Sequence, residues 1–516
     1  MEPVRARSDI SRWVPERPAD WLLVLGIVVV GFIFRSLPVL RGAGLQGYLG
    51  YDDGVYFASA VAFVHGVVPY RDFLFLHPPG IIVLLSPFAL LGAATDDSTG
   101  FAVARVAFML LGALNASLVM LVAGKYGRRS ALFAGALYAI WYSAIRVERT
   151  TLLLAPETTL LLISALVLSW TRPLGTRWAA VGGATLGLSV AIQLWQAIPL
   201  LIVVGSVALA SRDAPGGWRR PVFALVAGAA AAFTAVCLPS FLTAPSEFVR
   251  FVLLDQLARP DSGVSIIRRL RDIESFPLDG TRFLINAAVL GLAALGAAAV
   301  VGVAARVPAA RMWCVLMVVQ TAYLLASPVF LAHYRGWVAP AAAIVLGTAA
   351  ATVVGALDRH RRRGIAARGG LAMLAAGIAL TTPHQLGTVL QRAALEQDLG
   401  DARCVSADAP TLLLETTGLR RNLQNGCRLV LDSTGIAFDT DRGRLAPGPQ
   451  DASRRGAPVY QQAMEAYFAG SNAAMFARLP AVGLTAETKA AITQKLPVVV
   501  KRGSVTVMLP AATAGR

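Results

Sequence analysis

Long apolar runs, separated by short polar and basic stretches, recur along the chain as far as residue 392. Three of them are residues 21–40, 101–123 and 283–305. A helix needs about 20 predominantly apolar residues to cross a bilayer, and a soluble protein could not bury so many such runs. The pattern predicts a membrane all-α protein in which residues 21–392 form a multi-span helical bundle.

Basic residues at the ends of the apolar runs set the direction of the chain. Arginines concentrate before the first run and again at residues 359–363, and basic residues collect in cytoplasmic loops. The tail, residues 1–20, is therefore predicted to be cytoplasmic, and the first run is too long for a cleavable signal peptide. The alternation gives about eleven spans, at residues 21–41, 101–123, 131–145, 152–170, 178–192, 195–211, 221–239, 283–305, 312–331, 337–357 and 370–389.

The apolar stretch 81–94 is too short for a comfortable span. If it crossed the membrane, Asp96 and Asp97 would face the cytoplasm and the basic residues at 125–129 would face outside, against the charge rule. We therefore expect an interfacial helix there. All of loop 42–100 is then extracytoplasmic.

The composition supports a membrane protein. Of 516 residues, 56% are hydrophobic and 15% are charged, against about a quarter charged in soluble domains. The net charge of +17 would suggest nucleic acid in a soluble protein. Here cytoplasmic loops account for it, and the sequence contains no nucleic-acid reader motif. We expect membrane lipids, and no nucleic acid, as partners.

Residues 393–516 follow a different pattern. Long apolar runs stop, strand-like stretches occur at Leu429–Leu431 and Val498–Val500, and a helical pattern covers Tyr460–Arg478. This predicts a small extracytoplasmic α/β domain. Two of the four cysteines, Cys404 and Cys427, lie in it and are candidates for a disulfide if the domain is outside the cell.

Charged side chains gather in three predicted outer loops. Loop 42–100 carries the acidic pair Asp52-Asp53, loop 240–282 carries several arginines, and a short loop holds residues 333–335, His-Tyr-Arg. A carboxylate can deprotonate an acceptor hydroxyl as a general base. Arginine and histidine at the membrane edge can hold a leaving phosphate. The set suits glycosyl transfer from a lipid-phosphate sugar whose lipid tail lies in the bilayer.

The first outer loop also carries a family resemblance. Its elements are Tyr51-Asp52-Asp53-Gly54-Val55-Tyr56, Gly66, Pro69-Tyr70-Arg71-Asp72 and His77-Pro78-Pro79-Gly80. They resemble the first-loop signature of the GT-C superfamily of polyprenyl-phosphate-sugar-dependent membrane glycosyltransferases. The nearest groups are the protein O-mannosyltransferases and the aminoarabinose transferases, and actinobacterial arabinofuranosyltransferases share the general architecture. The resemblance covers residues 20–350 in topology but is specific only in the first loop.

The resemblance implies an inverting transfer. Asp52 matches the general base, whereas Asp53 stands where many members have Glu, with a supporting, acceptor-binding or metal-linked role. His77 matches the basic residue that approaches the donor phosphate. Gln193 departs from the aminoarabinose transferases, which have Lys nearby. The candidates are, for catalysis, Asp52 and Asp53; for the donor phosphate, His77, Arg259, His333, Tyr334 and Arg335; and for substrate contacts, Tyr56, Tyr70, Arg71, Glu157, Gln193 and Asp255.

Other interpretations stay open at this point. Asp52 or Asp53 could cap the following helix, and the protein could instead be a transporter or flippase of a lipid-linked sugar, or a scaffold that displays residues 393–516. Asp52, Asp53 and His77 offer ligands that would suit a divalent metal, but no spacing requires one. The sugar and the acceptor, whether a cell-envelope glycan, a lipid or a protein, are not determined. The expected location is the plasma membrane.

Overall fold

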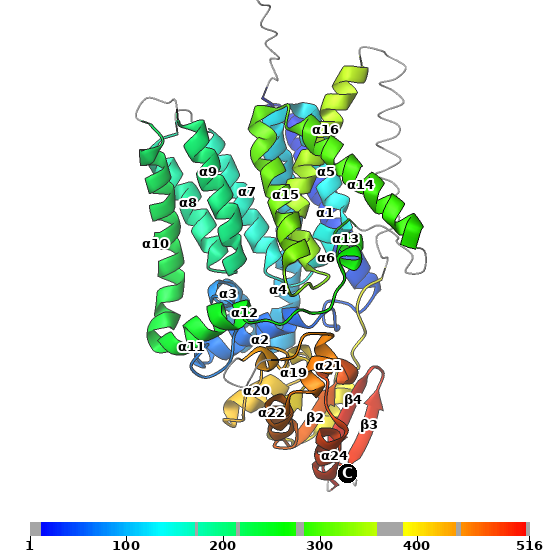
Figure 1. Ribbon diagram of the computed structural model, residues 1–516. Coiled ribbons are helices and arrows are strands. Elements are labelled where there is room, and N and C mark those ends of the chain that lie inside the picture. Colours follow the sequence, from blue (N-terminus) through cyan, green and yellow to red (C-terminus); the bar gives the residue numbers. More distant parts are fainter. Residues whose placement is uncertain are drawn as a thin grey trace, which may run out of the picture.

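The computed structural model describes residues 12–170, 174–212, 217–274, 283–358, 385–439 and 445–511. A bundle of long helices stands above a smaller α/β domain, and a layer of short helices lies between them (Figure 1). The bundle therefore meets the C-terminal domain at one of its two ends.

The long helices follow the predicted spans closely. They are α1 (Pro18–Arg41), α4 (Asp97–Ala123), α5 (Arg128–Ile140), α6 (Tyr142–Glu148), α7 (Leu154–Trp170), α8 (Thr176–Val190), α9 (Ala197–Ala210), α10 (Arg219–Thr243), α14 (Phe283–Ala304), α15 (Arg311–Ala326) and α16 (Ala339–Leu357). Within the described residues, five helices are long and apolar enough to cross a membrane, and the pair α5–α6, bent by 58°, would make a sixth. Several others are apolar but shorter. The total of about eleven spans stays a prediction, and most of the last, 370–389, lies outside the described residues.

The short helices between bundle and domain come mainly from the two predicted outer loops (Figure 1). They are α2 (Asp52–Val64), α3 (Gly80–Ala94), η2 (Leu194–Gln196), α11 (Pro245–Val249), η3 (Arg250–Leu254), α12 (Asp255–Leu257), α13 (Ile266–Glu274) and η5 (Tyr334–Trp337). The predicted interfacial stretch 81–94 is thus the helix α3, which packs on α2 and α4.

The C-terminal domain is built on a four-stranded sheet of order β1-β2-β4-β3. Strand β1 runs parallel to β2, and β4 runs antiparallel to both β2 and β3. The strands are β1 (Val405–Ala407), β2 (Ala473–Phe476), β3 (Val498–Arg502) and β4 (Val505–Leu509). The helices are α18 (Arg392–Leu399), α19 (Pro410–Leu414), α20 (Gly418–Gln424), η6 (Gly435–Phe438), α21 (Gln450–Arg455), α22 (Pro458–Phe468), α23 (Leu479–Val482) and α24 (Ala486–Lys495).

Two local predictions in this domain are wrong. Residues 429–431 form no strand. They lie in an irregular segment in which Val430 and Leu431 are buried. The helical pattern from Tyr460 ends at Phe468, and the fully buried stretch that follows is the central strand β2. Short apolar runs do not by themselves distinguish strand, helix and buried loop. The strand predicted at 498–500 is present as β3.

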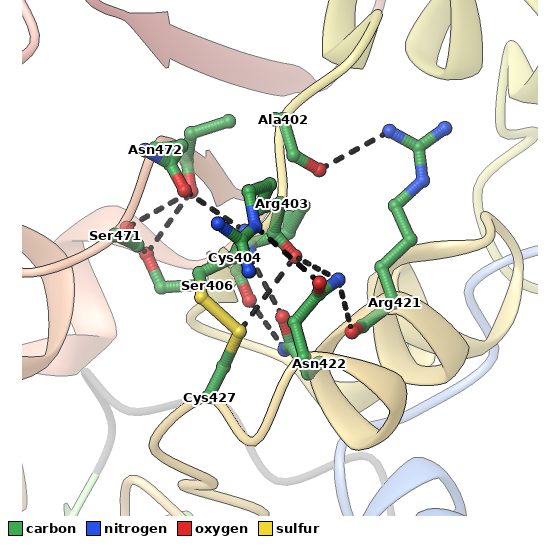
Figure 2. Close-up of a disulfide and its surroundings, with 12 residues drawn as sticks. Ala402, Arg403, Cys404, Ser406, Arg421, Asn422, Cys427, Ser471 and Asn472 are labelled. Atoms are coloured by element: carbon green, nitrogen blue, oxygen red, sulfur yellow. Dashed lines mark hydrogen bonds between the residues drawn. A yellow bond between two sulfur atoms is a disulfide. The ribbon is translucent and has the colours of Figure 1, made fainter.

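A disulfide joins Cys404, just before β1, to Cys427, just after α20, with their Cα atoms 5.7 Å apart (Figure 2). The side chain of Asn422 supports the same junction, accepting from the backbone N–H of Val405 at 2.8 Å and donating to its carbonyl at 2.7 Å. The start of β1 is therefore fixed to α20 by a covalent bond and by side-chain hydrogen bonds.

Candidate active site

A cavity of about 70 Å³ lies where the short-helix layer meets the C-terminal domain. It brings together seven of the predicted site residues, which are Asp52, Tyr56, His77, Gln193, Arg259, His333 and Tyr334. These residues come from four separate segments of the bundle chain and converge only in the folded protein. The C-terminal domain contributes Asp432, Thr434, Phe438 and Gln450 to the same walls.

Asp52 is the first residue of α2, where the positive end of the helix dipole favours a carboxylate. Its side chain is 33% exposed, and its Oδ2 lies 3.8 Å from Nδ1 of His333. Burial raises the pKa of Asp52 to about 6, while the cations Arg478 and Arg259 hold it down and Asp53 raises it. A carboxyl with this pKa is mostly ionised near neutral pH and is still basic enough to take a proton.

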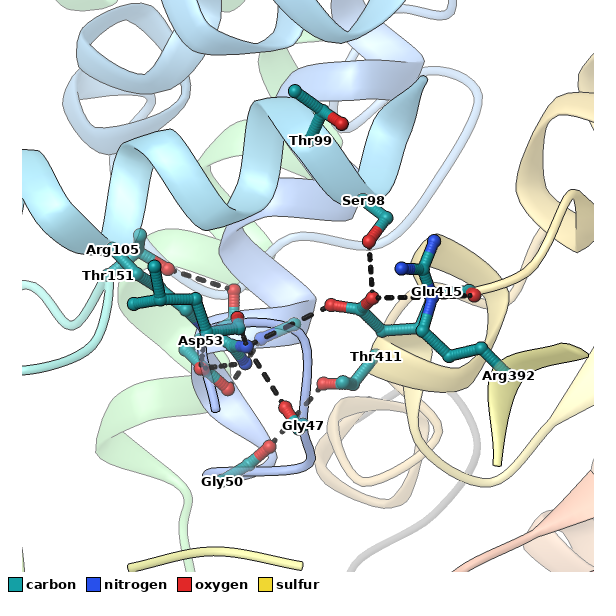
Figure 3. Close-up of polar contacts among 12 residues, drawn as sticks. Gly47, Gly50, Asp53, Ser98, Thr99, Arg105, Thr151, Arg392, Thr411 and Glu415 are labelled. Carbon is teal, nitrogen blue, oxygen red and sulfur yellow. Dashed lines mark hydrogen bonds and ion pairs between the residues drawn. The ribbon is translucent and has the colours of Figure 1, made fainter. Parts of the chain in front are cut away.

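Asp53 is turned away from the cavity. Its side chain is only 1% exposed, and its Oδ2 accepts from Nη2 of Arg105 at 2.8 Å. Figure 3 shows that the same arginine also reaches the carbonyl of Gly47 in the loop before α2 and approaches Glu415 of the C-terminal domain. The predicted pair therefore separates into a cavity residue, Asp52, and a residue that anchors the loop presenting it. Neither is the helix cap, which is Tyr51.

The approach of the C-terminal domain explains one motif glycine. A Cβ at Gly54 would lie 2.4 Å from Oγ1 of Thr411, so α19 could not pack on α2 with any larger residue there. Gly80 plays the same part for His77, since a Cβ at Gly80 would lie 2.5 Å from the carbonyl oxygen of Ala191 at the end of α8.

Both cavity histidines are held neutral. Burial lowers the pKa of His77 to about 3, with Arg259 and His333 acting in the same direction. Burial also lowers the pKa of His333 to about 3, helped by Arg146 and Arg335. Each neutral histidine can donate a hydrogen bond from a ring N–H, but neither carries a positive charge. The hydroxyl of Tyr70 donates to the carbonyl of His77 at 2.6 Å and fixes its backbone.

Arg259 is the one Lys or Arg side chain among the described residues that line the cavity. Its guanidinium lies 4.6 Å from the ring centre of Phe438, so the C-terminal domain holds it in place from one side. Its buried Nε has no hydrogen-bond partner among the described residues. The cavity thus brings together two carboxyl groups, Asp52 and Asp432, and one arginine; Asp432 accepts a hydrogen bond from Tyr51 at 2.8 Å.

The remaining predicted residues do not line the cavity. Tyr70 is buried and positions His77, whereas Arg71 is 53% exposed and pairs with Asp72 at 2.8 Å. Glu157 is buried in α7 and accepts a hydrogen bond from Gln196. Asp255 is buried in α12, and the guanidinium of Arg335 lies 4.7 Å from the ring centre of Tyr142.

The C-terminal residues at the site are ones that sequence reasoning missed. The hydroxyl of Tyr51, next to Asp52, donates to Oδ1 of Asp432 at 2.8 Å and accepts from the N–H of Thr434 at 3.0 Å. The guanidinium of Arg478 lies 3.8 Å from the centre of the same tyrosine ring. No spacing in the sequence links these residues to the first loop. The tyrosine beside the acidic pair, Tyr51, is the one local feature that could have indicated a further contact at the site.

We expect replacement of Arg478 by glutamine to move the acid limb of the pH–rate profile to higher pH. Arg478 favours the ionised form of Asp52, so its loss raises the pKa of that carboxyl and leaves it protonated at a pH where it is ionised in the native protein; the rate should fall there if Asp52 acts as a base. Initial rates from pH 5 to 9 would fall several-fold more at the acid end than at pH 8. Arg478→Lys keeps the charge and is the control. An unmoved acid limb in Arg478→Gln would contradict this account.

The described residues hold no ready-made metal site. No group of three or more His, Cys, Asp or Glu side chains with the geometry to hold an ion occurs in the described parts of the chain. The pair that would offer two carboxylates is divided, because Asp53 is committed to Arg105. We therefore derive no step through a metal.

Solved structures share this fold over nearly the whole chain. The structure of ArnT from Cupriavidus metallidurans bound to undecaprenyl phosphate matches with a TM-score of 0.58 and 16% identity, covering 97% of this chain and 100% of that chain. The apo structure matches with a TM-score of 0.58 and 18% identity, over 96% and 98%. An oligosaccharyltransferase from Archaeoglobus fulgidus, in complex with Zn and sulfate, gives 0.50 and 16%, over 73% of this chain and 55% of that chain.

No protein-family model matches the sequence, and no curated protein matches it. The protein has the fold of the GT-C glycosyltransferases, as its first-loop motif predicts. Its apolar helices are those of a membrane protein.

Proposed function

We propose that this protein is an integral membrane glycosyltransferase that moves a sugar from a polyprenyl-phosphate donor to a cell-envelope acceptor, with inversion at the anomeric carbon. The observation that carries the proposal is the set of side chains that line the cavity. Asp52, with a pKa of about 6, and the partly buried Arg259 share its walls, and the histidines beside them are neutral. These groups suit a reaction that needs a base to take a proton and a cation to stabilise an anionic leaving group.

The atoms balance without a second acid. Asp52 takes the proton of the acceptor hydroxyl, the acceptor oxygen bonds to the anomeric carbon, and the bond from that carbon to the phosphate oxygen breaks. The electron pair leaves on the phosphate, whose negative charge Arg259 compensates. His77, Tyr56 and Tyr334 line the same cavity and can donate neutral hydrogen bonds to phosphate or sugar oxygens. A glycoside hydrolase, in contrast, needs two carboxyl groups.

We propose that the reaction takes place on the extracytoplasmic side of the plasma membrane. The basic tail and the run at residues 359–363 favour cytoplasmic positions for those segments. The disulfide between Cys404 and Cys427 is of the kind that persists in oxidising compartments, where we place the C-terminal domain. The sugar, and whether the acceptor is a glycan, a lipid or a protein, are left open by this proposal.

Replacing Arg259 by alanine is expected to weaken binding of undecaprenyl phosphate by about 10- to 100-fold, because a hydrogen-bonded charged partner contributes about 1.5–3 kcal/mol. The purified protein in detergent would be titrated with undecaprenyl phosphate and bound lipid counted by native mass spectrometry. Arg71→Ala, which removes an exposed arginine from the first loop, should bind like the native protein. Equal affinity in Arg259→Ala and Arg71→Ala would refute the phosphate assignment.

A further inference from the structure

A second, larger cavity lies at the other end of the bundle. It has a volume of about 910 Å³ and is lined by α7, α8, α9, α10 and α15 with the short turns η1 (Gly124–Tyr126) and η4 (Pro308–Ala310). Figure 1 shows these helix ends on the side of the bundle away from the C-terminal domain. None of its lining residues is shared with the cavity around Asp52, so the proposed transfer does not explain it.

The walls of this cavity are apolar and lie between two groups of helices. Leu209 of α9, one of the lining residues, is 75% exposed. Other apolar lining residues come from both sides of the gap, and they are Ala165, Leu168, Val203, Val207, Ala210, Met312 and Trp313. An apolar surface of this kind inside a bilayer suits an acyl chain.

The rim of the cavity is basic. Lys125, Arg220 and Arg311 contribute to its lining, and the described lining residues include no Asp or Glu. The Nε–H of Arg311 donates a hydrogen bond to the carbonyl of Ala305 at 3.0 Å. This bond holds the side chain in place, and the terminal nitrogens can still donate to another group. Lys125 donates to the carbonyl of Ala165 at 3.0 Å. Three cations are thus gathered at one end of an apolar space.

We propose that this cavity binds an anionic glycerophospholipid from the adjacent leaflet, with its phosphate at the basic rim and an acyl chain against α9 and α15. Basic pockets between membrane helices on the cytoplasmic side are suited to anionic headgroups, and the positive-inside rule places this end there. A water-soluble phosphate compound would leave the apolar walls without contacts. A neutral lipid would bring no negative charge to a rim whose described residues include three basic side chains and no Asp or Glu. The bound lipid fills the gap between the two groups of helices and stabilises their arrangement.

The test compares lipid retention by the full-length protein. Native protein in detergent is mixed with equal amounts of phosphatidylglycerol and phosphatidylcholine, and retained lipid is counted by native mass spectrometry. The native protein should retain phosphatidylglycerol in preference to phosphatidylcholine. The variant Lys125→Ala/Arg220→Ala/Arg311→Ala should bind phosphatidylglycerol about 100-fold more weakly.

A matched control removes three arginines from the same end without touching the cavity. Arg177, Arg212 and Arg219 are exposed and do not line it, so Arg177→Ala/Arg212→Ala/Arg219→Ala should retain phosphatidylglycerol like the native protein. Ala210→Trp should lower retention by filling the apolar part with no change of charge. Equal retention of both lipids by the native protein, or equal loss in the two triple variants, would overturn the proposal. The readout does not involve sugar transfer and therefore does not depend on the proposed activity.

Discussion

Replacing Asp52 by asparagine is expected to lower the rate of sugar transfer by about 100- to 10,000-fold, the range that a positioned general base contributes. The amide keeps the size and shape of the side chain but cannot accept the acceptor's proton. The cavity offers no nearby carboxylate as a substitute, because Asp53 is paired with Arg105 and Asp432 is bonded to Tyr51. Membranes that contain the variant would be assayed for labelled product from an endogenous polyprenyl-phosphate sugar pool.

Asp72→Asn is the matched control for Asp52→Asn. Asp72 lies in the same loop, pairs with the exposed Arg71 and does not line the cavity, so its loss should leave the rate nearly unchanged. Full turnover by Asp52→Asn would end the assignment of the base. Exchange of a lipid-linked sugar across proteoliposomes with no covalent product would instead favour the transporter alternative.

Replacing Arg105 by alanine is expected to cost about 3–5 kcal/mol of stability, the usual penalty for removing one partner of a buried ion pair. The variant leaves the carboxylate of Asp53 buried without its cation. It also removes the contact at 3.9 Å to Glu415 of the C-terminal domain, whose pKa burial raises to about 8. Arg392 at 3.3 Å and Ser98 at 2.5 Å would remain beside Glu415 (Figure 3).

Thermal unfolding and limited proteolysis of the C-terminal domain would report the loss of Arg105. The double variant Asp53→Ala/Arg105→Ala should be more stable than the sum of the single variants predicts, because it leaves no unpaired aspartate. Arg71→Ala, which breaks an exposed pair, should cost no more than about 1 kcal/mol. A cost of that small size for Arg105→Ala would show that the network does not hold the two parts together.

The sequence predicted the site around Asp52 because its signals are local. The acidic pair, the His-Pro-Pro-Gly element and the His-Tyr-Arg loop are each contiguous, and the charge rule placed them on one face. The family resemblance assigned the base to Asp52 and a supporting role to Asp53, but the sequence did not reveal that Asp53 is paired with Arg105. Successive side chains on a helix point about 100° apart, and only the position of Arg105 on α4 decides which of the two carboxylates turns inward.

The chain by itself determined the membrane class, the first-loop motif and the candidate base, because hydrophobic length, loop charge and short motifs are properties of contiguous residues. The tertiary structure decided which of those residues share a cavity and in what charge state. It held His77 and His333 neutral through burial, and it left Arg259 as the cation among the described lining residues. It also set Asp432 and Arg478 beside Tyr51. Burial and contacts between segments hundreds of residues apart arise from packing, and no local pattern in the sequence encodes them.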